Sequence, residues 1–247
     1  MIKKHKLCPV KIISRASELY QKYWKEFSLI LLLVIIASSL SGIGMRIDPV
    51  TGNAVRTGLG HITGILSWLL TGYISLASIR YTLKLLRGKE EKLDALFSEV
   101  HSLKQYVYFL LGKIIVGFIT SLAFVFLVFL PILVIGISIK SMGGYLLFIP
   151  LIGLIISIYI SLSFFLVPYL LADKEMGVFE SIDQSWKMMK GKRCKIFILG
   201  VLLVLLNIIG VLALGFGILI TIPITMIAGV VAYEEIQKLS HSHTHHS

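Results

Sequence analysis

Four histidines near the end of the chain come closest, by type and spacing, to a metal site. They are His241, His243, His245 and His246, and neutral imidazoles are ligands for zinc, copper and nickel. No second ligand type at a fixed spacing accompanies them, so nothing sets a coordination geometry. The sequence therefore favours a disordered or artificially added His-rich tail over residues 236–247. We expect no metal site and no cofactor.

Three polar residues lie within or at the edge of long apolar runs and are the next candidates for chemistry. Lys113 lies about two turns past the start of its run, and no run contains an acidic residue to pair with it. We expect its ammonium group to reach back to the lipid headgroups. His61 is expected to form hydrogen bonds at an interface, and Asn207 to link helices. The sequence also lacks HExxH, GxSxG, CxxC and phosphate-binding glycine-loop motifs, so we expect no enzyme activity.

The elements that carry these residues are membrane spans. Of the 247 residues, 56% are apolar and 15% are charged, and the mean hydropathy is +0.88, whereas soluble domains carry about 25% charged residues. A spanning helix needs about 20 apolar residues, because its backbone polar groups must be satisfied internally. Suitable runs cover residues 27–45, 58–79, 107–139, 143–172 and 194–233.

The last run is long enough for two spans, with a break at Gly215–Gly217. The sequence therefore predicts an all-α polytopic membrane protein with six transmembrane helices in one integral domain, residues 1–247. The path between Pro131 and Pro150 stays open. Either the third and fourth helices extend beyond the bilayer with proline kinks, which we favour, or a short outer segment separates them.

Charge predicts the orientation, because Lys and Arg resist translocation across the membrane. Of the 24 Lys and Arg residues, only Arg46, Arg56 and Lys140 fall on one side of the six spans, and of the 13 acidic residues only Asp48 does. Both termini are thus predicted to be cytoplasmic. The basic inner face should bind anionic lipid headgroups. A nucleic-acid partner is not needed to explain the basic balance.

An amphipathic segment precedes each pair of spans, which predicts three parallel repeats over residues 9–85, 90–172 and 176–235. The second apolar stripe comprises Leu93, Leu96, Phe97, Val100 and Leu103. The third comprises Val178, Phe179, Ile182, Trp186 and Met189, with Ser181 and Ser185 on the less apolar side. Each stripe is expected to lie in the membrane interface or pack within the chain, or else to bind a membrane-protein partner.

A motif between the fourth and fifth spans resembles a known family pattern. The matching residues are Pro168, Asp173, Gly177, Glu180, Ser181 and Ser185, followed by Trp186 and a basic step. The motif is similar to that of the YciC-like (UPF0259) and DUF975 bacterial membrane proteins, and of the membrane domain of some glycerophosphodiester phosphodiesterases. The resemblance implies a bacterial cytoplasmic membrane protein and no catalytic residues. These six residues form the candidate functional cluster.

Taken together, the sequence favours a non-enzymatic multi-pass membrane protein with an accessory or organising role in envelope or lipid processes. The alternative is a small permease, channel or lipid translocator. Parallel repeats and acid-free spans disfavour ion-coupled transport, but they leave passive transport and lipid translocation open.

Overall fold

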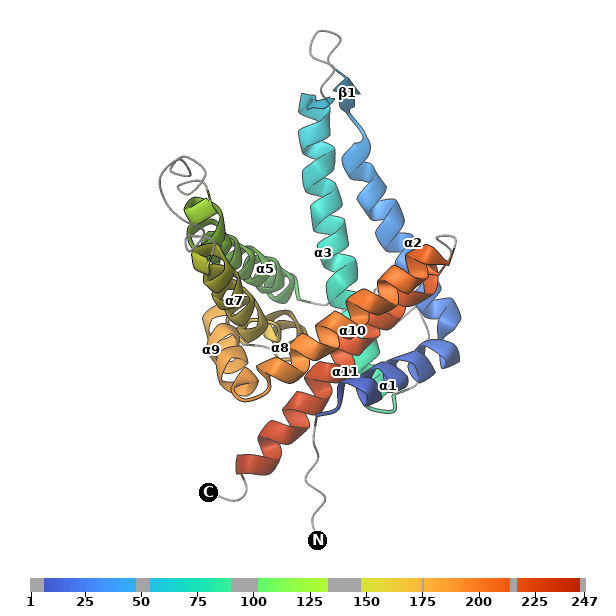
Figure 1. Cartoon of the computed structure of the whole chain (residues 1–247). Coiled ribbons are helices and arrows are strands. Elements are labelled where there is room, and N and C mark those ends of the chain that lie inside the picture. Colours follow the sequence, from blue (N-terminus) through green and yellow to red (C-terminus); the bar gives the residue numbers. More distant parts are fainter. Residues whose placement is uncertain are drawn as a thin grey trace. The chain divides into compact units, whose positions relative to one another are not determined.

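A computed structural model describes an all-α chain with one short β-hairpin (Figure 1). The described residues are 7–47, 54–89, 102–132, 148–174, 176–213 and 217–244. Six helical segments in this part of the chain are long and apolar enough to cross a membrane: Trp24–Gly42, Gly58–Leu86, Leu103–Ile132, Phe148–Asp173, Arg193–Leu212 and Ile218–Ser240. The predicted multi-pass helical class, with six candidate spans, is confirmed.

The chain forms two compact units, which are described separately. The 107–198 unit contains Val107–Ile198 with the two chain ends, Met1–Leu7 and Glu235–Ser247. The 8–106 unit contains Cys8–Tyr106 together with Leu199–Glu234. The boundaries of the predicted repeats differ from these unit boundaries. The single domain over residues 1–247 stays a prediction.

In the 8–106 unit, α1 (Pro9–Lys22) is an amphipathic helix that runs crosswise to α3 (Gly58–Leu86) (Figure 1). Pro9 suits the first helical turn, where a backbone N–H would have no helical partner. Ile12 and Ala16 are buried, whereas Lys11 is exposed. The helix ends at Tyr23, and α2 (Trp24–Ser39) follows at once. The first predicted span therefore begins three residues earlier than its apolar run indicates.

The first candidate span ends before Met45, which is the last residue of its apolar run. The helix gives way to η1 (Leu40–Gly42), and Met45 lies in β1 (Met45–Ile47), which pairs antiparallel with β2 (Ala54–Arg56). Gly44 turns the chain with φ of +83°, and a Cβ there would lie 2.6 Å from the backbone nitrogen of Gly60. This close approach between the turn and the start of α3 ends the helix before Met45.

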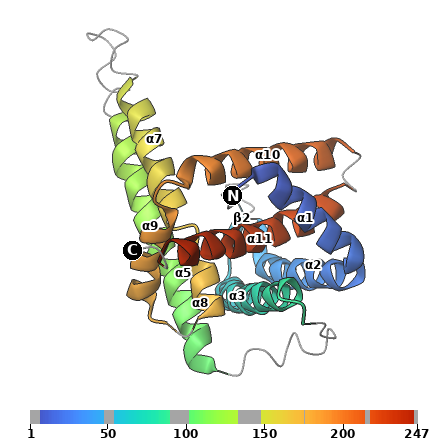
Figure 2. The ribbon, with the colours of Figure 1, turned by 90° about the horizontal axis from the view of Figure 1, so that it is seen from below.

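Helices α2 and α3 lie side by side in Figures 1 and 2 and contact one another. Phe27 and Tyr81 pack edge to face with ring centroids 6.2 Å apart. Thr57 caps α3 by accepting a hydrogen bond from the Gly60 N–H. The helix continues seven residues beyond the predicted end at Ile79. Its last turn contains Lys84, and a cation there interacts favourably with the helix dipole.

In the 107–198 unit, α5 (Leu103–Phe124), whose first turn belongs to the other unit, continues into the π-helical η2 (Val125–Phe129). Beside it lies α7 (Phe148–Ser163) (Figure 2). A Cβ at Gly153 of α7 would overlap the carbonyl oxygen of Leu127. Glycine thus allows α7 to approach the widened π turn. The path between Pro131 and Pro150, for which the sequence leaves two alternatives, lies mostly outside the described residues.

Two short helices follow α7: α8 (Val167–Asp173) and α9 (Val178–Met189). The turn at residues 164–166 separates α7 from α8, just before Pro168 of the family-like motif. Helix α9 contacts both α7 and α8. These three helices frame the polar cluster described below.

The last two spans are α10 (Arg193–Leu212) and α11 (Ile218–Thr244). The predicted disordered tail from residue 236 is wrong as far as Thr244, because α11 continues to that residue. Ile236 is fully buried, and the Ser240 hydroxyl donates to the Ile236 carbonyl oxygen. Apolar burial therefore extends the helix past the end of the predicted span.

Candidate functional site

The buried face of α9 combines part of its apolar stripe, Val178 and Met189, with two serines. Ser181 and Ser185 are fully buried, whereas Phe179 is 77% exposed and Trp186 is 41% exposed. Small serines let α9 approach its neighbours closely, and their hydroxyls find acceptors in the backbone. The sequence places these serines on the less apolar side of the helix. Their burial depends on close packing and on hydrogen bonds, which the apolar pattern does not register.

Ser185 joins α9 to the end of α7. Its hydroxyl donates a buried hydrogen bond of 2.7 Å to the Ser163 carbonyl oxygen, which lies in the last turn of α7 and has no partner from the helix itself. Ser181 instead donates to the Gly177 carbonyl oxygen at 2.9 Å, within its own helix. Ser185 thus connects the candidate cluster to neighbouring residues that the sequence analysis did not select.

Arg193, the first residue of α10, lies at the centre of those neighbours. Its Nε donates to the Ser163 hydroxyl at 2.8 Å, and its Nη1 donates to the Tyr159 hydroxyl at 2.6 Å. The guanidinium carbon is 4.2 Å from the Tyr159 ring centroid and 4.9 Å from that of Trp186, which are cation–π distances. Two helices and two aromatic rings therefore fix the guanidinium group in place.

One nitrogen of this guanidinium group is left without a partner. Arg193 Nη2 is buried and makes no hydrogen bond. Leaving such a donor unsatisfied costs about 1–3 kcal/mol, and more for a charged group. None of the described carboxylates forms an ion pair with Arg193. The positive charge and one buried donor thus remain available.

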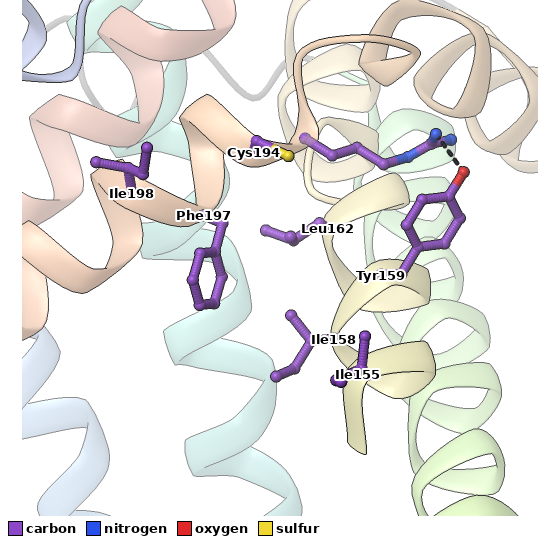
Figure 3. Close-up of a pocket in the computed structure, with 8 residues that line it drawn as sticks. Ile155, Ile158, Tyr159, Leu162, Cys194, Phe197 and Ile198 are labelled. Atoms are coloured by element: carbon purple, nitrogen blue, oxygen red, sulfur yellow. Dashed lines mark hydrogen bonds between the residues drawn. The ribbon is translucent and has the colours of Figure 1, made fainter. Parts of the chain in front are cut away.

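Arg193 and Tyr159 also belong to the lining of an apolar groove of about 440 Å³ (Figure 3). Its walls come from α7 and the start of α10, and consist of Ile155, Ile158, Tyr159, Leu162, Arg193, Cys194, Phe197 and Ile198. In Figure 3, Ile158, Leu162 and Phe197 project into the space between the two helices, and the dashed line marks the hydrogen bond to Tyr159. The groove surface is almost entirely apolar, and Arg193 is the one charged residue among those that line it.

Further basic residues lie near the start of α10. Lys190 is exposed, and Lys192 Nζ donates to the Met188 carbonyl oxygen at 3.2 Å. Burial lowers the pKa of Lys192 from its usual range, because desolvation disfavours the charged form. The Lys187 ammonium is paired with Asp183 at 2.5 Å on the exposed side of α9. The local field at the start of α10 is therefore positive.

The six residues of the predicted cluster do not converge on one point. Pro168 and Asp173 lie at the beginning and end of α8, whereas Gly177 precedes α9 as its N-cap. Glu180 is exposed on α9. Of the six, Ser185 is the residue that a hydrogen bond connects to the arginine cluster through Ser163.

The three polar residues that the sequence placed within or at the edge of apolar runs are not among the residues that line the groove. Lys113 is exposed on α5, with Nζ 5.4 Å from the Phe109 ring centroid. His61 is exposed in the first turns of α3. Asn207 Nδ2 donates to the Leu203 carbonyl oxygen at 2.8 Å and to the Thr225 hydroxyl at 2.9 Å, so it joins α10 to α11.

The tail histidines contribute no described metal site. His241 and His243 lie within the range of α11, but their side chains are outside the described residues, as are His245 and His246 altogether. Among the residues that the structure describes, no group of three or more His, Cys, Asp or Glu side chains could hold a metal ion.

Sequence reasoning missed Arg193, Tyr159 and Ser163. In the sequence, Arg193 is part of the basic step after Trp186, and Tyr159 and Ser163 lie within the apolar run over residues 143–172. The available signal was the spacing of four residues between Tyr159 and Ser163, which places both on one face of a helix end. An arginine among lysines was a second signal, because a guanidinium group makes several directed hydrogen bonds.

A family model described as a protein of unknown function (DUF975) matches residues 9–240. The chain belongs to the DUF975 family. The match includes all six candidate spans and every residue of the groove. No curated protein and no solved structure matches the chain significantly. The likeness to YciC-like proteins and to phosphodiesterase membrane domains fits this membership but remains a resemblance.

Proposed function

We propose that this DUF975 protein is a non-enzymatic component of the bacterial cytoplasmic membrane that organises anionic lipid at the inner leaflet. Both termini are cytoplasmic in this proposal. The chain comprises three parallel repeats, each an amphipathic segment followed by a transmembrane hairpin. The basic segments between the hairpins then all face the same leaflet, which concentrates positive charge there.

The observation that carries the proposal is the arrangement of α1. It lies crosswise to α3 (Figure 1), which suits a helix in the plane of the membrane interface. Lys11 and Lys22 are exposed on it. At its junction with α2, Lys22 Nζ is 5.0 Å from the Tyr23 ring centroid and Lys25 Nζ is 5.8 Å from that of Trp24. Aromatic and basic residues of this kind are typical of the headgroup region.

Energy transfer to labelled lipid tests this proposal. The protein has three tryptophans as donors, and the acceptor is dansyl-labelled phosphatidylglycerol exchanged into the leaflet that contacts the proposed cytoplasmic face. We expect stronger transfer to this lipid than to dansyl-labelled phosphatidylcholine. The preference should fall in the Lys11→Glu/Lys22→Glu variant, because each cation near the surface contributes about 1 kcal/mol.

The control is Arg46→Glu/Arg56→Glu, which makes the same charge change on the proposed outer face. That variant should keep the preference. Equal transfer to both lipids by the unaltered protein would contradict the proposal. A parallel measurement of labelled-lipid movement across protein-containing and protein-free vesicles addresses the translocator alternative, and we expect equal rates.

A further inference from the structure

We infer that the groove between α7 and the start of α10 is a binding site for one anionic phospholipid, with its phosphate on Arg193 and an acyl chain against Ile158 and Phe197. This inference rests on the proposed function and names the lipid site within it. It depends on three features of the 107–198 unit: an unpaired guanidinium donor, a fixed guanidinium orientation, and an apolar groove that Arg193 helps to line.

The unpaired donor determines what kind of atom the site accepts. Arg193 Nη2 is buried and has no acceptor in the protein. The guanidinium group is positively charged and forms no ion pair with the described carboxylates, so an anionic oxygen is the acceptor that fits this donor best. Phosphate oxygens match a guanidinium group well, since they accept two parallel hydrogen bonds and balance its charge.

The fixed orientation makes Arg193 more than one charge among many. Hydrogen bonds to Ser163 and Tyr159 occupy Nε and Nη1, and the Trp186 ring lies 4.9 Å from the guanidinium carbon. These contacts hold the group in place before a ligand arrives, so less side-chain entropy is lost on binding. The lysines nearby lack this support, and we expect them to attract anionic lipid without positioning it.

The groove determines the rest of the ligand. Its volume of about 440 Å³ is within the range of about 300–1,000 Å³ typical of small-molecule sites. Its walls beyond Arg193 and Tyr159 are almost entirely aliphatic or aromatic. From Leu162 to Ile155 the groove follows α7 for about 10 Å, at 1.5 Å per residue. A water-soluble phosphate leaves these walls uncovered, whereas an acyl chain covers them.

The direction of the groove agrees with the proposed topology. Arg193 begins a candidate span, so it lies at the level of the cytoplasmic headgroups, and Ile155 and Ile198 lie deeper in the hydrocarbon. A phospholipid of the inner leaflet has the same order, with phosphate at the surface and acyl chains below. The start of α10 also presents the positive end of the helix dipole to the phosphate.

Native mass spectrometry of the full chain, purified in mild detergent with phosphatidylglycerol and phosphatidylethanolamine, tests the site. We expect the unaltered protein to retain one phosphatidylglycerol in preference to phosphatidylethanolamine. Arg193→Met should reduce this retention at least tenfold, and Arg193→Lys should reduce it less. The matched control is Lys195→Met, which removes the same charge two residues along α10 and should change retention less than twofold.

A second variant and a second readout cover the case in which Arg193→Met folds poorly. Ile155→Trp, at a residue that is 61% exposed on the groove wall, should displace the lipid without removing charge. In a Cys8→Ser background, the exposed Cys194 on the groove wall reports occupancy through its rate of maleimide labelling. Phosphatidylglycerol should slow this labelling in the Cys8→Ser protein, and much less after Ile155→Trp.

Several results would overturn the inference. Equal losses in Arg193→Met and Lys195→Met would indicate a diffuse basic surface, leaving the proposed function intact but removing the specific site. Protection of Cys194 by glycerophosphate as strong as that by phosphatidylglycerol would mean that the acyl chain does not contribute. Equal retention of both lipids by the unaltered protein would contradict the anionic preference and the proposed function together.

Discussion

The two ends of α10 differ in how their polar groups are used. At its far end, in the 8–106 unit, Asn207 donates to Thr225 of α11, and Gly210 lies close to Thr221 and Gly217. At its beginning, in the 107–198 unit, Arg193 borders a groove and keeps one buried nitrogen without a partner. The far end also holds buried polar atoms without a partner, Asn207 Oδ1 and Thr221 Oγ1. What distinguishes the beginning is that its unpaired atom belongs to a charged group whose residue lines a groove.

This comparison indicates that the role of a polar residue in a span depends on the side chains around it. Small residues beside Asn207 bring the helices together, as is usual in membrane interfaces. Around Arg193 the neighbours are aromatic rings and large aliphatic side chains, which leave a groove. Four predictions test this difference, beginning with the largest expected effect.

The first prediction concerns α9. Its Ser185 contacts Ser163, which in turn accepts a hydrogen bond from Arg193 at the beginning of α10. Ser181→Leu should destabilise the protein by about 1–3 kcal/mol, because Ser181 is fully buried and a larger side chain overpacks its site. Phe179→Ser, on the exposed side of the same helix, should change stability by less than about 0.5 kcal/mol in detergent. Thermal unfolding of both variants checks the orientation. A larger loss from Phe179→Ser would restore the face predicted from the apolar pattern.

The second prediction concerns close packing at the far end of α10. A Cβ at Gly210 would lie 2.6 Å from Thr221 Oγ1 and 3.1 Å from the Gly217 carbonyl carbon. Gly210→Ala should therefore cost about 1–2 kcal/mol, since overpacking exceeds the gain in helix propensity. Gly200→Ala is the matched control, because a Cβ there meets nothing within 4 Å. Gly200→Ala should stabilise the helix by up to about 1 kcal/mol. Similar unfolding temperatures for Gly210→Ala and Gly200→Ala would contradict close packing at Gly210.

The third prediction concerns the hydrogen bond between Asn207 and Thr225. A double-mutant cycle with Asn207→Ala and Thr225→Val should give a coupling free energy of about 0.6 kcal/mol, and at most about 1.7 kcal/mol. The value is modest because unfolded spans also find polar partners within the membrane. Equilibrium unfolding in detergent measures it. A coupling free energy of zero would mean that the bond does not join α10 to α11.

The fourth prediction concerns pH and Lys192, and its effect is the smallest. Burial lowers the folded-state pKa of Lys192, so the unfolded chain binds more protons between that pKa and about 10.4. The destabilising contribution of Lys192 is complete below the folded-state pKa and disappears as the pH rises through this interval. Lys192→Met should weaken the rise in stability measured between neutral and alkaline pH. An unchanged pH profile would show that the ammonium group is fully solvated in the folded protein.

The sequence predicted the spans well, because apolar length is a property of each segment by itself. The breaks near Pro168 and before Ile218 were likewise visible locally. The β-hairpin after Gly44 was missed because it depends on a contact with Gly60, sixteen residues away. The burial of the α9 serines was not visible in the apolar pattern, because it depends on hydrogen bonds to α7 and to the residue that precedes α9.

The candidate site was predicted only in part. Ser185 was selected from a family-like motif, but its partner Ser163 and the arginine beyond it come from separate helices. Hydrophobic periodicity does not register tertiary hydrogen bonds between helix ends. The family-like motif therefore identified the connection between the fourth and fifth spans without identifying Arg193 as the central residue.

Cysteine accessibility tests the central claim most directly, namely that the Arg193 end of α10 faces the cytoplasm. In a Cys8→Ser/Cys194→Ser background, Lys190→Cys places one thiol beside that end, and Arg56→Cys places one on the β-hairpin; both positions are exposed. We predict that a membrane-impermeant maleimide labels the Arg56→Cys protein in intact cells and the Lys190→Cys protein only after the membrane is opened. Labelling of the Lys190→Cys protein in intact cells would contradict the topology and the inner-leaflet lipid site.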